Sequence, residues 1–195
     1  MSKAFQVVFV CTGNRARSPL AEALYRAYSE GVETSVTSYG TTDVGDAPPL
    51  PQAVEAAATL GVDLSGHRAR PLERQSLGGA DLVLGFEPFH QAVAVVDGGA
   101  PAANTFLVAE LVSLLDTPPV GADDATRART AVAYADSRRV RSRPAETATV
   151  ADPLGKPDEV MFGTAERIEE LVRLLVDGLF GKARSTRAGE HKSAE

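Results

Sequence analysis

Cysteine is almost absent from this sequence of 195 residues, which contains only Cys11. A single thiol cannot form an internal disulfide, so we expect a protein of a reducing compartment. Long apolar runs are missing too, and none approaches the ~20 residues that a bilayer-spanning helix needs. Residues 1–6 do not form a signal peptide, because the short apolar run that follows Lys3 is interrupted by Gln6. We therefore expect a cytoplasmic protein with no membrane partner.

Positive charge and metal-ligand clusters are also scarce. The chain has 20 Lys and Arg against 26 Asp and Glu, a net charge of −6, which argues against general nucleic-acid binding. No group of His, Cys, Asp and Glu has metal-ligand spacing, and the Gly-Lys-Ser/Thr of a nucleotide-binding loop is missing. We therefore expect no metal and no cofactor. The length and a hydrophobic content of 44% suffice for one domain with a full core.

One stretch near the N-terminus has the features of an anion-binding loop. The apolar, β-branched run over residues 5–10 predicts a buried strand, and apolar residues at helical spacing after Pro19 predict a helix. Ser18 is the expected N-cap of that helix, with Pro19 as its first residue. The loop between strand and helix directs backbone N–H groups and a helix N-terminus to one point, which predicts a site for a tetrahedral oxyanion.

Two side chains of this loop suggest a reaction. Arg17 can donate two parallel hydrogen bonds to an oxyanion. Cys11 faces the same positive field, so we expect a thiolate, the nucleophile that phosphoryl transfer needs. Asn14 is expected to hold a left-handed backbone conformation, and the Ser18 hydroxyl can reach back to the thiolate. The structural alternative is a core cysteine beside an arginine whose head reaches water.

The longer string Cys-x5-Arg-Ser, with Gly13 and Asn14 inside and Pro19 and Glu22 following, resembles the signature loop of the low-molecular-weight protein tyrosine phosphatases. The resemblance covers about residues 5–115 and 150–178. It implies an α/β fold: a single three-layer domain with a four-stranded parallel sheet flanked by helices and the phosphate-binding loop after the first strand. It also implies substrate binding by the loop residues Thr12, Gly13, Asn14, Arg15, Ala16 and Ser18.

The same resemblance suggests roles for residues far from the loop. The family places an Asp-Pro pair before its last helix, and the only such pair here begins at Asp152. Asp152 is therefore the expected general acid and base, with a plain turn aspartate as the alternative. Ser38 and His67 match a buried network around the loop asparagine, although His67 could instead be an exposed loop residue. Glu87 matches a carboxylate near the mouth of the site, and we expect His90 on a helix surface.

The rest of the chain alternates strands and helices, which is typical of a parallel, right-handed sheet with ligands at the carboxyl ends of its strands. We expect the domain to span 1–180 and the polar segment 181–195 to be a disordered tail. Residues 116–149 form an atypical helical segment ending in arginines, which we assign to a solvated helix end rather than to an anionic partner. The expected strands are 33–39, 81–86 and 104–107, and the expected helices are 19–29, 52–60, 88–96, 108–115, 122–139 and 159–179.

Departures from the family pattern leave the substrate open. Ala16 replaces a second loop cysteine of many members, so an intra-loop disulfide is impossible. Leu154 stands where phosphotyrosine-specific members have an aromatic residue, and the 41–47 loop has none. Tyr39 or Phe89 could supply the missing aromatic wall. Our hypothesis is that neither does so fully, which gives a wider and less tyrosine-selective cleft.

Together these features predict a phosphomonoester hydrolase, and the resemblance implies a protein-tyrosine phosphatase with a cysteinyl-phosphate intermediate. Its partner is a phosphorylated protein or a small phosphomonoester, and phosphate and other oxyanions are expected inhibitors. A related branch binds arsenate in this loop, so an arsenate reductase that uses an external small thiol is the alternative. A non-catalytic phosphate-binding protein is the third possibility, and the intact Cys11, Arg17 and Asp152 argue against it. The oligomeric state stays open.

Overall fold

The computed structural model describes residues 3–73, 76–116, 120–139 and 148–181. Four parallel strands form one sheet, as predicted, and their order is β2-β1-β3-β4. The strands β1 and β3 occupy the centre of this sheet, where both of its faces are covered. The strands are β1 (Phe5–Cys11), β2 (Thr34–Gly40), β3 (Leu82–Gly85) and β4 (Thr105–Leu107).

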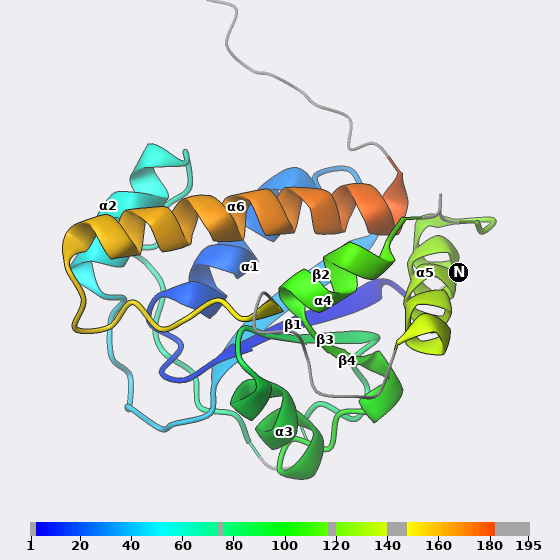
Figure 1. The fold of residues 1–195 in the computed structure, drawn as a ribbon, viewed down its shortest axis with the longest axis horizontal. Helices are drawn as coiled ribbons and strands as arrows, with labels where there is room; N and C mark the ends of the chain where they lie inside the picture. Colours follow the sequence, from blue (N-terminus) through cyan, green and yellow to red (C-terminus); the bar gives the residue numbers. More distant parts are fainter. Residues whose placement is uncertain (1–2, 74–75, 117–119, 140–147, 182–195) are drawn as a thin grey trace, which may run out of the picture.

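Helices cover the two faces of the sheet unequally (Figure 1). One face carries a layer in which the long C-terminal helix α6 packs against the neighbouring helices, while α3 lies on the opposite face. The strand–helix alternation expected from the sequence is therefore confirmed, with most boundaries shifted by one or two residues. The helices are α1 (Arg17–Tyr28), α2 (Pro51–Thr59), α3 (Pro88–Val96), α4 (Val108–Leu114), α5 (Asp124–Arg138) and α6 (Asp158–Phe180), with a short 3-10 turn at Ala102–Asn104.

Strand β1 supplies both halves of the core because its side chains alternate between the two faces of the sheet. Phe5, Phe9 and Cys11 belong to the larger cluster on the α6 side, whereas Val8 and Val10 belong to the smaller cluster with α3. The strand ends at Cys11, whose side chain is only 3% exposed. The alternation therefore puts the thiol on the same face of the sheet as α1, at the carboxyl end of a central strand.

Helix α6 holds the larger layer together. Its buried residues recur at helical spacing, which gives one apolar face along its 23 residues. Burying each large apolar side chain contributes about 1.5–3 kcal/mol, so this helix is a major source of stability. Small buried alanines of α2 and α5, such as Ala56 and Ala128, allow those helices to approach closely. None of the described helices is long and apolar enough to cross a membrane.

Helix α1 begins earlier than the sequence suggested. Its N-cap is Ala16, and the first backbone bond runs from the Leu20 N–H to the Ala16 carbonyl at 3.1 Å. The prediction of Ser18 as N-cap is therefore wrong. The reason is that the Ser18 hydroxyl is engaged elsewhere, by Cys11 and Asn14, so it does not satisfy the N–H groups of the helix end.

The helix predicted over 122–139 is present as α5, and Asp123 caps it by accepting a hydrogen bond from the Thr126 N–H at 2.7 Å. The expectation of a solvated arginine end is wrong for Arg139. Its guanidinium lies 3.6 Å from the centroid of the Phe106 ring and donates to the Thr105 carbonyl at 2.9 Å. An arginine can bury its stem and stack on an aromatic face, which periodicity does not reveal. Arg141, Arg143 and the predicted tail over 182–195 lie outside the described residues.

Gly40, the last residue of β2, lies where the sheet approaches the loop after β1. A substitution at Gly40 therefore tests how closely the sheet and the loop pack. A Cβ atom at this position would lie 2.9 Å from the Thr12 carbonyl oxygen and 3.1 Å from the Asn14 nitrogen. Since both are backbone atoms, Gly40→Ala should lower the free energy of unfolding by about 1–3 kcal/mol. Urea denaturation measures this. The control Gly163→Ala, where no atom lies within 4 Å of the added Cβ, should be neutral or slightly stabilising. Equal losses in both variants would contradict the close approach.

Candidate active site

The loop between β1 and α1 depends on Asn14, which has a φ of +52° and is fully buried. The left-handed conformation expected for this residue is confirmed. Its side-chain amide donates to Ser18 Oγ and Ser38 Oγ, both at 2.8 Å, and its Oδ1 accepts from the Arg70 N–H at 2.9 Å. Because every polar atom of this side chain has a partner, the strained backbone is held in one conformation.

The network expected around Asn14 extends to two other segments. Ser38 Oγ donates to Glu22 Oε2 at 2.6 Å, and His67 Nε2 lies 2.9 Å from the Asn14 carbonyl oxygen. Burial lowers the pKa of His67, so the ring is neutral at pH 7 and Nε2 carries the hydrogen that the carbonyl accepts. The alternative of an exposed loop histidine is therefore wrong. Glu22 is also buried, at 7% exposure, although its place on the polar side of the helix pattern did not indicate it.

The Cys11 thiol has one close polar neighbour among the described side chains, Ser18 Oγ at 2.9 Å. Ser18 Oγ accepts an amide hydrogen of Asn14 and also lies 3.4 Å from the Tyr39 carbonyl oxygen, so the Cys11 sulfur and this carbonyl are the two acceptors within reach of its hydroxyl hydrogen. The side chains of Asn14 and Ser18 therefore lie behind the loop, where they support it.

Arg17 is the most buried charge of the site, with 2% exposure. Its guanidinium donates to Glu87 Oε2 at 2.6 Å, Asp152 Oδ2 at 2.5 Å and the Val150 carbonyl at 2.9 Å. A weaker contact reaches Thr12 Oγ1 at 3.2 Å. A charge removed from water needs such partners, and they orient the guanidinium beside the loop. Glu87 thus lies at the site, as the family resemblance suggested.

Asp152 reaches the loop through the segment that precedes α6. The Val150 N–H donates to the Phe86 carbonyl at 2.8 Å, and the Val150 carbonyl accepts from Arg17. The Leu154 N–H donates to Asp152 Oδ1 at 3.0 Å, which leaves Oδ2 for Arg17. The structure therefore brings Cys11, Arg17 and Asp152 together, although Asp152 is far from the other two in sequence.

The expectation that His90 lies on a helix surface is wrong, since the residue is fully buried. Its Nδ1 accepts from the Glu87 N–H at 3.1 Å, so Nε2 bears the hydrogen and faces Thr12 Oγ1 at 3.0 Å. Burial and the nearby charge of Arg17 lower the pKa of His90 to about 4, so the ring is neutral at pH 7. A signal existed in the sequence: His90 lies three residues after Glu87 at a helix start, the spacing of a reciprocal cap.

These contacts orient the Thr12 hydroxyl group. Its hydroxyl oxygen accepts hydrogen bonds from both Arg17 and His90, so its own hydrogen is left for another acceptor. Thr12 also lines the hollow in front of the loop, where that acceptor would lie.

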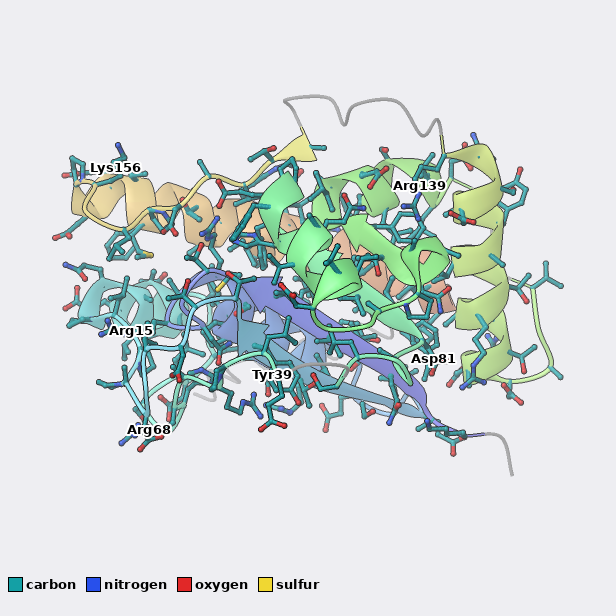
Figure 2. The ribbon with its side chains drawn as sticks, turned by 90° about the horizontal axis from the view of Figure 1, so that it is seen from below. Arg15, Tyr39, Arg68, Asp81, Arg139 and Lys156 are labelled. Carbon is teal, nitrogen blue, oxygen red and sulfur yellow. The ribbon has the colours of Figure 1, made fainter. Side chains whose placement is uncertain are left out.

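This front hollow has a volume of about 230 Å³. Cys11, Arg17 and Asp152 line it together with the apolar side chains of Val44, Leu50 and Leu154 and with the loop residues Thr12, Gly13, Arg15 and Ala16. Figure 2 shows Arg15 beside α2, at the same end of the molecule as Lys156, with Tyr39 farther from that end. Among the described residues that line the hollow there is no aromatic side chain.

Comparison with known proteins decides the family. The family model described as "Low molecular weight phosphotyrosine protein phosphatase" matches residues 6–113. The chain belongs to this family. The matched region contains the whole loop but ends before Asp152, so the position of that carboxylate beside Arg17 is a separate observation from the structure.

Similar proteins carry the names of more than one activity. The protein-arginine-phosphatase of Bacillus subtilis is 34% identical over 109 residues, which are 55% of this chain and 72% of that protein. A solved low-molecular-weight protein tyrosine phosphatase from T. tengcongensis is 31% identical, with a TM-score of 0.67 over 89% of this chain and 99% of its own. A YwlE arginine phosphatase mutant with a phosphorylated active-site serine is 27% identical, with a TM-score of 0.67 over 90% and 95%.

Proposed function

We propose that this protein is a phosphatase of phosphotyrosyl proteins in which Cys11 is the nucleophile, Arg17 the phosphate clamp and Asp152 the general acid and base. The observation that carries the proposal is the meeting of these three residues at one hollow, with Arg17 Nη2 only 2.5 Å from Asp152 Oδ2. Family membership supports the reaction class. The residue roles are argued from the geometry and chemistry of this chain.

In the first step, the Cys11 thiolate attacks phosphorus and forms the S–P bond while the bond to the leaving oxygen breaks. The N–H groups of the loop and the guanidinium of Arg17 stabilise the equatorial oxygens as negative charge spreads over them. The Thr12 hydroxyl has a free hydrogen for one of these oxygens. Asp152 gives its proton to the departing oxygen, which leaves as the phenol.

Arg17 also links Asp152 to the position of the phosphate. Without substrate, the guanidinium forms ion pairs with both Glu87 and Asp152. A phosphate dianion bound over Cys11 would share the same guanidinium and place negative charge near Asp152. The shared guanidinium therefore keeps Asp152 beside the bound phosphate, where the first step requires it.

In the second step, a water molecule attacks phosphorus and gives a proton to the Asp152 carboxylate. The S–P bond breaks, inorganic phosphate forms and Cys11 leaves as the thiolate, beside Ser18 Oγ. Phosphate and other tetrahedral oxyanions should therefore inhibit by occupying the loop.

Two features favour an aryl phosphate over a phosphorylated guanidinium. The walls of the front hollow are apolar at Val44, Leu50 and Leu154, which suits a ring. Arg15 lines the same hollow and its Nε donates to the Pro48 carbonyl at 2.7 Å, which keeps a second positive charge there. That charge repels a cationic leaving group. Tyrosine selectivity should still be modest, because Tyr39 and Phe89 are not among the described lining residues.

Arsenate reduction is the alternative reaction for this loop. Cys11 is the only cysteine of the sequence, so the chain has no second thiol to resolve an intermediate, and an external small thiol would be required. A reactive lone thiolate also favours a reducing compartment, and we propose the cytoplasm on that ground. Side-by-side assays with phosphotyrosyl peptides, phosphoarginine, and arsenate plus candidate thiols separate the reactions.

The covalent step is tested with Cys11→Ser. Turnover of p-nitrophenyl phosphate should fall to background, because a hydroxyl in this loop is a far weaker nucleophile than a thiolate. Mass spectrometry of the variant after incubation with substrate should detect one added phosphoryl group on the serine, the state in which the similar YwlE mutant was solved. Substantial turnover in Cys11→Ser would contradict the mechanism.

The role of Asp152 is tested with Asp152→Asn across aryl phosphates whose phenols differ in pKa. A general acid contributes about 10²–10⁴-fold, and poor leaving groups depend on it most. The variant should therefore lose more rate with each increase in leaving-group pKa. Asp158→Asn, at the start of α6, serves as the matched control and should behave as the parent enzyme does. Parallel leaving-group plots for Asp152→Asn and the parent would exclude Asp152 as the acid.

The missing aromatic wall is tested with Leu154→Tyr. Leu154 lines the front hollow and is 64% exposed, so a larger ring can be accommodated. Contact with the substrate ring is worth roughly 0.5–1.5 kcal/mol, and kcat/KM for phosphotyrosyl peptides should rise up to about tenfold. An alkyl phosphate should gain little, and Val160→Tyr on the surface of α6 should change neither. An equal gain on both substrates would show that another residue forms the wall.

A further inference from the structure

A second hollow lies behind the catalytic loop, between α1 and residues 63–70. Its volume is about 450 Å³, and it shares no described lining residue with the front hollow. Its polar wall consists of Glu22, Asp63 and His67 together with three arginines, Arg26, Arg68 and Arg70. Figure 2 shows Arg68 at the outer edge of this end of the molecule. We call this hollow the rear pocket.

Positive charge exceeds negative charge in the rear pocket. Glu22 forms ion pairs with two arginines. Its Oε1 lies 2.8 Å from Arg26 Nη2, and its Oε2 lies 2.7 Å from Arg70 Nη2. The second carboxylate, Asp63, accepts from the N–H and the hydroxyl of Ser65. Arg26 and Arg70 therefore share the single carboxylate of Glu22, and Arg68 is paired with neither carboxylate of the pocket.

Two guanidinium groups have donors that these contacts do not use. Arg68 donates to the backbone carbonyls of Ser65 and His67, and within the described part of the chain no carboxylate lies within ion-pair distance of it. Arg70 Nε is buried and has no hydrogen-bond partner among the described residues. A buried donor without an acceptor is costly, so the Arg70 side chain has a hydrogen bond to gain when it turns toward an anion in the rear pocket.

The rear pocket is connected to the nucleophile by a chain of short hydrogen bonds. From Glu22 the chain passes to Ser38 at 2.6 Å, to Asn14 at 2.8 Å, to Ser18 at 2.8 Å and to Cys11 Sγ at 2.9 Å. A second wall residue, His67, contacts the Asn14 carbonyl directly. A ligand that moves Glu22 or Arg70 therefore acts on the residue that holds the catalytic loop.

We propose that the rear pocket binds a small polyanion with two or more phosphate or carboxylate groups, and that its binding lowers turnover at Cys11. Guanidinium groups bind both kinds of oxyanion through paired hydrogen bonds. A bound polyanion competes with Glu22 for Arg26 and Arg70, which leaves more negative charge behind a loop that must hold a thiolate and a phosphate dianion. The effect on turnover rests on the proposed phosphatase function, whereas the binding does not.

Binding is tested by titration calorimetry of the full chain with sodium tripolyphosphate and, separately, with citrate. Arg68→Ala removes the guanidinium of the pocket that has no carboxylate partner. The variant should therefore bind one polyanion fewer per chain than the parent. Arg167→Ala removes an arginine of α6 that pairs with Glu170 and does not line the pocket, and it should bind as the parent does. Saturable binding of either probe that depends on Arg68 supports the pocket, and the pair of probes separates a phosphate ligand from a carboxylate ligand. Equal stoichiometry in all three proteins would overturn it.

The coupling is tested by steady-state kinetics on p-nitrophenyl phosphate. A polyanion in the rear pocket should lower kcat by about fivefold, the lower end of typical coupling between sites. A polyanion in the catalytic loop instead competes with the substrate, so it raises KM for p-nitrophenyl phosphate and leaves kcat unchanged. The kcat effect should disappear in Arg68→Ala and persist in Arg167→Ala. Purely competitive inhibition in every variant would overturn the proposed coupling, while an inactive parent enzyme with Arg68-dependent binding would refute the phosphatase and leave the pocket intact.

Discussion

A buried guanidinium is the constraint on which the site depends. Arg17 is nearly inaccessible to water, and its charge is compensated by acceptors from the start of α3 and from the segment before α6. Removing either carboxylate would leave the buried guanidinium short of an acceptor, so these segments are held together by an energetic requirement. The same contacts direct the guanidinium to the place where Cys11 would meet a phosphate. The need to satisfy one charge thus brings Cys11, Arg17 and Asp152 into one hollow.

The backbone of the loop has a requirement of its own. Asn14 holds a conformation that few residues adopt, and it is surrounded by partners from α1, β2 and residues 67–70. Gly40 lets the backbone of β2 approach this loop, where a side chain would collide with it. Strain at a ligand-binding loop persists only where the surroundings determine it, and here they do so from three directions.

Both sides of the loop carry charge, and the two sides are linked. The front hollow contains Cys11 and Arg17, and the rear pocket contains Glu22 between two arginines. Asn14 and Ser18 separate them and bond to both sides. A change of charge behind the loop therefore has a short route of hydrogen bonds to the Cys11 sulfur, and the proposed regulation by small anions depends on this route.

The sequence by itself determined the elements and indicated the residues that we propose as the reacting groups. Three of the signals are local: the apolar run before Cys11, the apolar periodicity of α6, and the spacing from Cys11 to Arg17. Such signals depend on neighbouring residues alone and not on the fold. The resemblance of the loop to a known family then indicated Asp152. Only the tertiary structure decided which polar side chains are buried. His90 contacts Thr12, which is 78 residues away in the sequence, and Arg139 stacks on Phe106. Glu22 and His90 stand at positions that look polar and exposed in a helical pattern. Their burial depends on partners that the chain supplies from distant segments, which no window of neighbouring residues contains.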